Sequence, residues 1–299
     1  MSMSPPPSEE LSKVLSVEQL PAMPLSALSV LQLDNDVSKV NINDLVRPIE
    51  SDPGLAAQVL KFLNSSYFGF QSTISNIKQG IALVGIRIVK NFILWKAVFS
   101  LIPKSKYASF DVGMLWQDSL RRAMFARFLL LELKRGDPEI AFAGALLQDT
   151  AIPLLLKQRT EAYGNILNKV AHDPTLRLST LEKNIFGWNH AEAAGYLGRN
   201  WKLPIPLISI IEDHLDIEEA VQNINTHCEQ SVVALSAFLP AGMFQQWTEK
   251  ETFYSYFNIL FPHKREMVPA LFAKVDLEYE QYAVILQLAK PKLALCDYI

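Results

Sequence analysis

Asp149 is the residue whose surroundings most need a chemical explanation. It ends a nearly continuous apolar block, predicted to be helical over residues 139–149, so its carboxylate faces the negative end of the helix dipole. Burying an ionised carboxylate without a compensating partner is strongly unfavourable. A metal ion, a His or Arg side chain, or the backbone amides of Thr150 and Ala151 could supply that partner. The protein partners are the simpler interpretation.

Two histidines could carry metal or acid–base chemistry. Asn189-x-x-Glu192 has the pattern of a capping box, which places His190 in the first turn of a helix. A positive imidazole would oppose the dipole there, so we expect a neutral ring that can bind a metal or a hydrogen-bond partner. His214 ends a helix predicted over residues 205–214. The simpler interpretation is a partly buried helix-start histidine and a helix-end cap. We expect the other three histidines to be surface or capping residues.

Several reaction classes are excluded by missing motifs. The sequence contains no GxGxxG or GxxxxGK[ST] phosphate loop, no GxSxG and no HExxH. Cys228 and Cys296 are its only cysteines, too few for a disulfide framework or a cysteine-rich zinc module. A net charge of −3 argues against a sequence-independent nucleic-acid binder, so we expect no nucleic-acid partner.

Apolar residues recur at helical spacing throughout, and this periodicity predicts an all-α fold. Asp-Pro pairs at Asp52 and Asp137 are typical of an N-cap followed by proline in the first turn. The predicted helices span residues 24–33, 43–51, 53–63, 75–84, 86–101, 112–133, 139–149, 161–171, 178–186, 190–201, 205–214, 218–223, 229–239, 252–261, 267–273 and 277–288.

The remaining composition points to a soluble, cytoplasmic protein without membrane spans. Residues 1–10 lack the basic and apolar regions of a signal peptide, and we expect a disordered leader over residues 1–13. The longest uncharged apolar stretch, residues 230–248, contains Pro240 and Gly242 and is unsuited to spanning a bilayer.

Residues 203–249 carry seven acidic and no Lys or Arg side chains. This stretch is either a solvated face or a docking surface for a basic partner or a cation.

Several short motifs follow one another along the chain: Leu20-Pro21-x-x-Pro24, residues 49–55 (IESDPGL), 63–69 (LNSSYFG), 81–85 (IALVG), 115–120 (LWQDSL), 144–149 (GALLQD), 186–192 (FGWNHAE), 201–204 (WKLP) and Asp213-His214. Ser-Asp-Pro and Asn-Ser-x-x-Phe-Gly are the most specific of them. In order and spacing these motifs resemble the HDOD (HD-related output domain) family of bacterial signalling proteins. The resemblance covers residues 14–216 and implies two helical subdomains, one to about residue 104 and an HD-like one over about 110–216. Residues 217–299 would then be a C-terminal helical extension.

The resemblance also implies an eroded relative of the HD metal-dependent phosphohydrolase site. The first ligand histidine of that superfamily falls on Asp118, its His-Asp doublet on Gln148-Asp149, and later positions on His190 and on Asp213-His214. Gln148 supplies no imidazole, and the final aspartate finds only Ser231 and Ser236 on the helix predicted over residues 229–239. We therefore expect a vestigial pocket in which Asp149 faces His190 or His214. We expect no cofactor, although Asp118, Asp149, His190 and His214 could together hold a divalent ion.

Two functions follow from the resemblance. The first is a non-catalytic regulatory module that binds a signalling protein or a small ligand. The alternative is a divalent-metal-dependent phosphohydrolase acting on a nucleotide or cyclic dinucleotide. Tyr67, Phe68 and Phe70 form the candidate interaction surface, and an aromatic plug inside the core is the simpler interpretation of the same residues.

Overall fold

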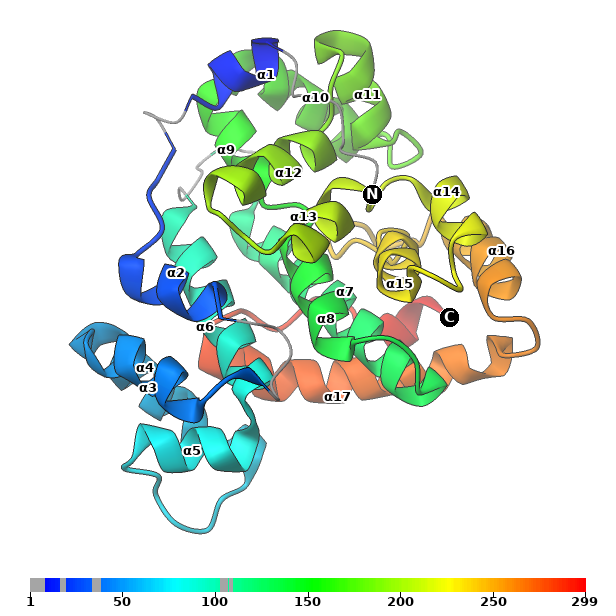
Figure 1. The fold of residues 1–299 in the computed structure, drawn as a ribbon. Coiled ribbons are helices and arrows are strands. Elements are labelled where there is room, and N and C mark those ends of the chain that lie inside the picture. Colours follow the sequence, from blue (N-terminus) through cyan, green and yellow to red (C-terminus); the bar gives the residue numbers. More distant parts are fainter. Residues whose placement is uncertain (1–8, 17–19, 34–38, 103–106, 108–109) are drawn as a thin grey trace.

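Helices account for the regular secondary structure of the part of the chain that the computed structural model describes: residues 9–16, 20–33, 39–102, 107 and 110–299. No strand occurs within these ranges, so the predicted all-α class is confirmed. Figure 1 shows most of the blue and cyan helices gathered at one side, the green and yellow helices in the centre, and the long α17 (Val268–Leu286) beneath the central helices.

The N-terminal helices are α1 (Glu9–Val14), α2 (Leu25–Leu31), α3 (Ile42–Glu50), α4 (Pro53–Leu63), α5 (Ile77–Val84) and α6 (Ile86–Leu101). The Ser-Asp-Pro motif starts α4, because the Asp52 carboxylate accepts from the Leu55 amide at 3.0 Å and from the Ser26 hydroxyl of α2 at 2.8 Å. The Asn-Ser motif closes the next loop. The Asn64 amide both donates to and accepts from the Ile74 backbone, each at 2.7 Å. These polar contacts fix α2, α4 and the approach to α5.

The HD-like part contains α7 (Val112–Leu133), α8 (Pro138–Leu147), α9 (Ala151–Gln158), α10 (Thr160–His172), α11 (Leu178–Phe186), α12 (His190–Asn200) and α13 (Ile205–Glu212). Helices α7 and α8 pack against each other in the core, where α8 is buried along nearly its whole length. One helical stretch among the described residues, Pro138–Gln158, is long and apolar enough to cross a membrane, but 89% of its most apolar window is buried inside the protein. Its apolar side chains therefore build the core.

The C-terminal helices are α14 (Ile217–Gln222), α15 (Cys228–Ser236), α16 (Lys250–Leu260) and α17, with short 3₁₀ turns at Ser66–Phe68 (η2), Arg265–Met267 (η3) and Leu295–Tyr298 (η4). They share the core of the preceding helices. Helix α15 packs on α7 and α8, and α17 packs on α7. The rings of Phe253 and Phe272 approach Phe125 of α7 at 5.8 and 6.1 Å. Residues 217–299 thus complete the core of the HD-like part.

The structure departs from the sequence prediction at three places. Residues 9–13 were expected in a disordered leader but belong to α1, because Leu11 and Val14 are buried against the core; residues 1–8 lie outside the described ranges. Helix α9 was missed, although Pro153 fits its first turn. The predicted pair 267–273 and 277–288 is the single helix α17, whose central Val275 is fully buried.

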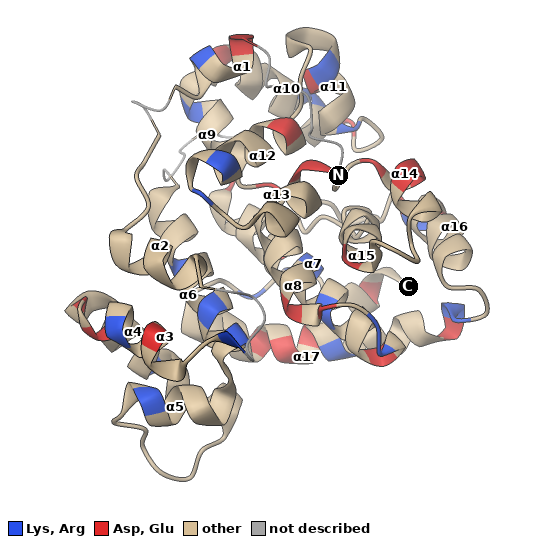
Figure 2. Cartoon of the chain, viewed as in Figure 1, with Lys and Arg blue, Asp and Glu red and all other residues tan. Residues whose placement is uncertain are grey.

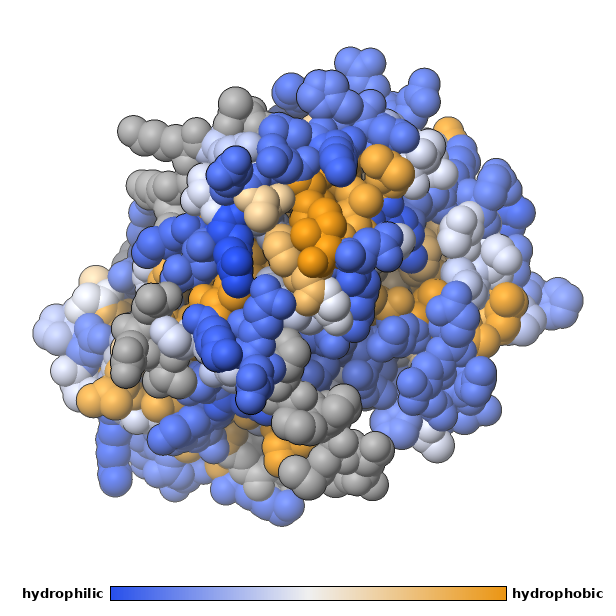
Figure 3. Space-filling model, turned by 90° about the horizontal axis from the view of Figure 1, so that it is seen from above, coloured by the Kyte–Doolittle hydropathy of each residue, from blue (hydrophilic) through white to orange (hydrophobic). Residues whose placement is uncertain are grey.

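Acidic side chains of residues 203–249 are bound largely within the protein. Figure 2 shows red segments around α13 and α14, with few blue ones beside them. Glu212 forms a bidentate pair with Arg199 at 2.7 and 2.8 Å, and Glu249 pairs with Arg177 at 3.1 Å. The Glu229 carboxylate accepts from the Asp137 amide at 2.6 Å. These acids hold helices together, which leaves less of the stretch for an external basic partner. The face of the molecule drawn in Figure 3 is mostly hydrophilic, with a hydrophobic area near its centre and smaller ones elsewhere.

Candidate functional site

Three side chains predicted from the sequence meet in the HD-like part. Asp149 lies in the turn between α8 and α9, His190 in the first turn of α12, and His214 just after α13. Asp149 Oδ1 lies 3.4 Å from His190 Nε2 and 3.6 Å from His214 Nε2. All three residues are buried, with 4%, 5% and 1% of their surface exposed. One ligand atom from each lies within 4.8 Å of the others, so the three could hold a metal ion.

The Nδ1 atom of each imidazole, which does not face Asp149, lies next to a hydrogen-bond acceptor. His190 Nδ1 lies 2.6 Å from Glu182 Oε2, which also accepts from the His190 amide at 2.9 Å. Glu182 is itself fully buried and receives the hydroxyl of Tyr163. His214 Nδ1 lies 2.7 Å from the Ile211 carbonyl oxygen. Nδ1 is therefore the donor in each ring, and both Nε2 atoms face Asp149.

Asp149 also forms an ion pair with an arginine. The Arg122 guanidinium of α7 donates to Asp149 Oδ2, and the two side chains are only 14% and 6% exposed. The compensating partners of Asp149 are thus Arg122 and His190, whereas His214 Nε2 has no hydrogen-bond partner among the described residues. Neither Arg122 nor Glu182 was identified as a site residue from the sequence, because nothing in the local spacing links them to Asp149 or His190.

The charge states of the cluster follow from burial and from these neighbours. Burial would raise the pKa of Asp149, but Arg122 and His190 hold it well below the usual value. Burial would lower the pKa of His190, but Glu182 and Asp149 outweigh it and raise this pKa to about 10, so the neutral ring expected from the helix dipole is wrong. Burial lowers the pKa of His214 in spite of Asp149. At neutral pH the cluster therefore contains two cations, Arg122 and His190, and two anions, Asp149 and Glu182, beside a neutral His214.

The other three predicted residues lie differently. Asp118 of α7 turns toward the C-terminal part of the chain, where both its carboxylate oxygens accept from the Gly242 amide at 2.9 and 3.1 Å. Asp213 binds Gln230 of α15 at 3.1 Å. Gln148 is fully buried, and its amide atoms have no hydrogen-bond partner among the described residues. The compact cluster thus contains Asp149, His190 and His214, whereas Asp118 and Asp213 are engaged elsewhere.

A hydrolytic metal ion fits these residues poorly. The donor types suit a divalent cation, and the unpartnered Nε2 of His214 is a suitable ligand atom. Catalysis also requires an open coordination position for water or substrate. The guanidinium of Arg122 takes one oxygen of Asp149, and no donor of the cluster reaches the surface appreciably. The charge already balances, so we derive no catalytic step through a metal.

The predicted aromatic surface is mostly packed into the protein. Tyr67 meets Tyr282 of α17 with ring centroids 4.4 Å apart, and Phe68 meets Phe62 of α4 at 5.1 Å. Both residues are half-buried, while Phe70 is 36% exposed and stacks on Phe68. The aromatic segment therefore joins α4 to α17, and Phe70 is its most exposed ring.

The fold and the site together define an all-helical protein with an internally compensated acid–histidine cluster. Its sequence matches the HDOD domain family over residues 20–217, and the chain belongs to that family. It is also 26% identical over 215 residues to an uncharacterized protein from Treponema pallidum. That alignment covers 68% of this chain and 39% of the relative, so the chain spans well under half of that relative's length.

Solved structures share the fold at low sequence identity. An HDOD domain protein of unknown function from Geobacter sulfurreducens matches with a TM-score of 0.71 and 17% identity, covering 92% of this chain and 97% of that one. A protein from Marinobacter aquaeolei, named for a proposed role in signal transduction, matches with a TM-score of 0.70 and 19% identity over 91% and 60% of the two chains. One from Shewanella amazonensis, named as a proposed phosphohydrolase, matches with a TM-score of 0.62 and 18% identity over 95% and 96%.

Proposed function

We propose that this HDOD protein is a non-catalytic regulatory module that acts in signal transduction by binding a protein or a small ligand in the cytoplasm. The observation that carries the proposal is the balanced cluster of Arg122, Asp149, His190 and Glu182. In it, a guanidinium and an imidazolium take the role that a metal would have in a hydrolase. Family membership and the Marinobacter neighbour named for signal transduction support the same function.

The second candidate is a divalent-metal-dependent phosphohydrolase acting on a nucleotide or cyclic dinucleotide. The observation in its favour is the orientation of the two histidines, whose Nδ1 atoms have acceptors and whose Nε2 atoms face one carboxylate oxygen. Metal-bound histidines are held in this way by hydrogen-bond acceptors on the ring nitrogen that does not bind the metal. Binding an ion would remove the proton from His190 Nε2 and place a divalent charge beside Arg122. That electrostatic cost makes this the weaker candidate.

Metal content and phosphate release distinguish the two candidates. The purified full chain would be analysed for Mn, Fe, Zn and Mg, and then assayed with nucleotides and cyclic dinucleotides in the presence of each metal. We expect substoichiometric metal and no phosphate release. Stoichiometric metal and turnover that are both lost in Asp149→Ala and kept in Asp213→Asn would overturn the proposal. Asp213→Asn is the matched control because that carboxylate points to α15.

A further inference from the structure

Two adjoining hollows lie where the N-terminal helices meet the HD-like helices. The outer one is a partly open hollow between α2, α6, α8 and α13, with about 560 Å³ of space when its open mouth is included. Its walls are largely aliphatic and include Leu31, Leu94, Ile140 and Leu207. No member of the Asp149 cluster lines it, so the hollow is separate from the HD-type site.

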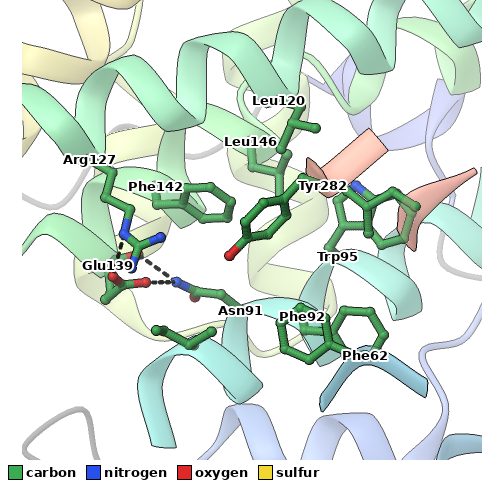
Figure 4. Close-up of a pocket in the computed structure, with 12 residues that line it drawn as sticks. Phe62, Asn91, Phe92, Trp95, Leu120, Arg127, Glu139, Phe142, Leu146 and Tyr282 are labelled. Carbon is green, nitrogen blue, oxygen red and sulfur yellow. Dashed lines mark hydrogen bonds and ion pairs between the residues drawn. The ribbon is translucent and has the colours of Figure 1, made fainter. Parts of the chain in front are cut away.

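The inner hollow has about 340 Å³ of space when its open side is included, and its lining is mostly apolar and rich in aromatic rings. Figure 4 shows the rings of Phe62, Phe92 and Trp95 on one side, with Arg127, Glu139 and Asn91 on the other. Asn91 and Glu139 line both hollows. The Asn91 amide donates to the Glu139 carboxylate at 2.9 Å, so one side-chain hydrogen bond lies at the boundary between the two spaces.

The acidic groups around these hollows already have partners. Asp137 Oδ1 caps α8 by accepting from the Glu139 amide at 3.0 Å, and its Oδ2 pairs with Arg87 at 3.1 Å. The Glu139 carboxylate pairs with Arg127 Nε at 2.7 Å in addition to Asn91. A ligand therefore meets few unused acceptors on these two carboxylates.

Unused donors are present instead. Arg87 Nε is buried and has no hydrogen-bond partner among the described residues, although its side chain as a whole is 40% exposed. Trp95 is 3% exposed, and its Nε1 likewise has no partner in the described part of the chain. Buried donors without partners are unfavourable, and a ligand oxygen would satisfy them. An anionic oxygen gains most at Arg87, because charge-assisted bonds to guanidinium are the stronger ones.

We propose that the outer hollow binds a small amphipathic carboxylate, with its anionic head on Arg87 and its apolar body between Leu94, Ile140 and Leu207. The inner aromatic hollow accommodates a longer or ring-bearing body once the Asn91–Glu139 bond opens. This inference rests on the proposed regulatory function, because the bound ligand is the signal that the regulatory module receives.

The position of the hollow allows a bound ligand to affect other parts of the protein. It contacts α2 and α6 on one side and α8 and α13 on the other, so binding fixes the two parts of the molecule relative to each other. Helix α8 leads from the hollow to Asp149, and α13 leads from it to His214. A shift of either helix would change the spacing within the acid–histidine cluster.

Calorimetric titration of the full chain tests the site with two probes of equal chain length, octanoate and 1-octanol. We expect saturable binding of octanoate, about tenfold tighter than 1-octanol, because one charge-assisted hydrogen bond is worth about one order of magnitude. Arg87→Gln should remove that difference. Arg47→Gln is the matched control, since Arg47 is exposed on α3 and does not line the hollow. Ala143→Leu, which fills the hollow, should weaken both probes.

Three results would overturn the inference: no saturable binding of octanoate up to millimolar concentration, equal affinity for the two probes, or equal losses in Arg87→Gln and Arg47→Gln. Far-ultraviolet circular dichroism checks the fold of each variant, and Arg87→Gln decides the question alone if Ala143→Leu does not fold. Phosphate release is measured separately. A catalytic protein that binds octanoate would therefore contradict only the proposed function, and an inactive protein that does not bind it would contradict only this inference.

Discussion

Arg122 of α7 and Asp149 of the α8–α9 turn form an ion pair that is almost entirely buried, although 27 residues separate them in the sequence. The pair anchors a chain of charges that continues through His190 to Glu182 and ends at the Tyr163 hydroxyl. Because each charge in this chain contacts an opposite one, the HD-type position is electrically balanced by protein groups. The arrangement joins α7, the α8–α9 turn, α10, α11 and α12.

Arg122→Ala tests the buried pair. Removing one partner leaves the other charge buried and unpaired, which typically costs about 3–5 kcal/mol. We expect a loss of that size in the free energy of unfolding, measured by urea denaturation at pH 7. The control is Arg159→Ala, which breaks an exposed pair with Glu10 and should cost less than about 1 kcal/mol. Similar losses in the two variants would contradict the role assigned to Arg122.

Glu182→Gln tests the charge state of His190. The carboxylate of Glu182 is one of the two groups that raise the pKa of His190 to about 10. Without that charge, we expect this pKa to fall toward the ordinary value of 6.5, so that the ring loses its proton at lower pH. Imidazole nitrogen shifts followed by NMR between pH 5 and 9 measure the change. An unchanged His190 titration would show that Glu182 does not set its charge.

The sequence predicted the parts of the site that depend on local structure. The capping box at Asn189 and Glu192 places His190 at the start of α12, and the structure contains both of its hydrogen bonds. The apolar block before Asp149 indicated that this carboxylate needs a partner. The identity of the partner depends on how α7 crosses the α8–α9 turn, and helical spacing along either segment does not encode that crossing.

The orientation of Asp118 was beyond local prediction for a similar reason. Its partner, the Gly242 amide, lies 124 residues away in a loop of the C-terminal part. The interpretation of residues 217–299 as an extension gave no reason to expect them beside Asp118. Their buried aromatic contacts with α7 show why they are there, since α7 would otherwise expose Phe125.

Asp118→Asn tests the burial of that carboxylate through the pH dependence of stability. Burial raises the pKa of Asp118 from 3.8 to about 6. A raised carboxyl pKa contributes stability that is fully present below about pH 4 and is lost as the pH rises through about 6. A shift of about two units corresponds to about 3 kcal/mol. The free energy of unfolding is measured with urea at pH 4, 5, 6 and 7. Between pH 4 and pH 7, that of the wild-type protein should fall by up to this amount relative to that of the variant. Parallel stability curves would contradict the prediction.

Gly144→Ala tests the close approach of α8 to α13, the two helices that connect the proposed ligand hollow to the acid–histidine cluster. A Cβ atom at Gly144 would lie 2.3 Å from Ile210 Cγ2, so either the Ile210 side chain or one of the two helices must shift. Overpacking of this kind costs about 1–3 kcal/mol, which outweighs the gain of up to about 1 kcal/mol that alanine brings to a helix. Gly54→Ala is the matched control, because Gly54 is exposed in the first turn of α4 and meets only its own N-cap side chain. We expect the midpoint of thermal unfolding to be lower in Gly144→Ala than in the wild-type protein, and to be unchanged or higher in Gly54→Ala. Equal midpoints for the two variants would show that α8 and α13 have room to separate, and that ligand-driven movement between them meets little resistance.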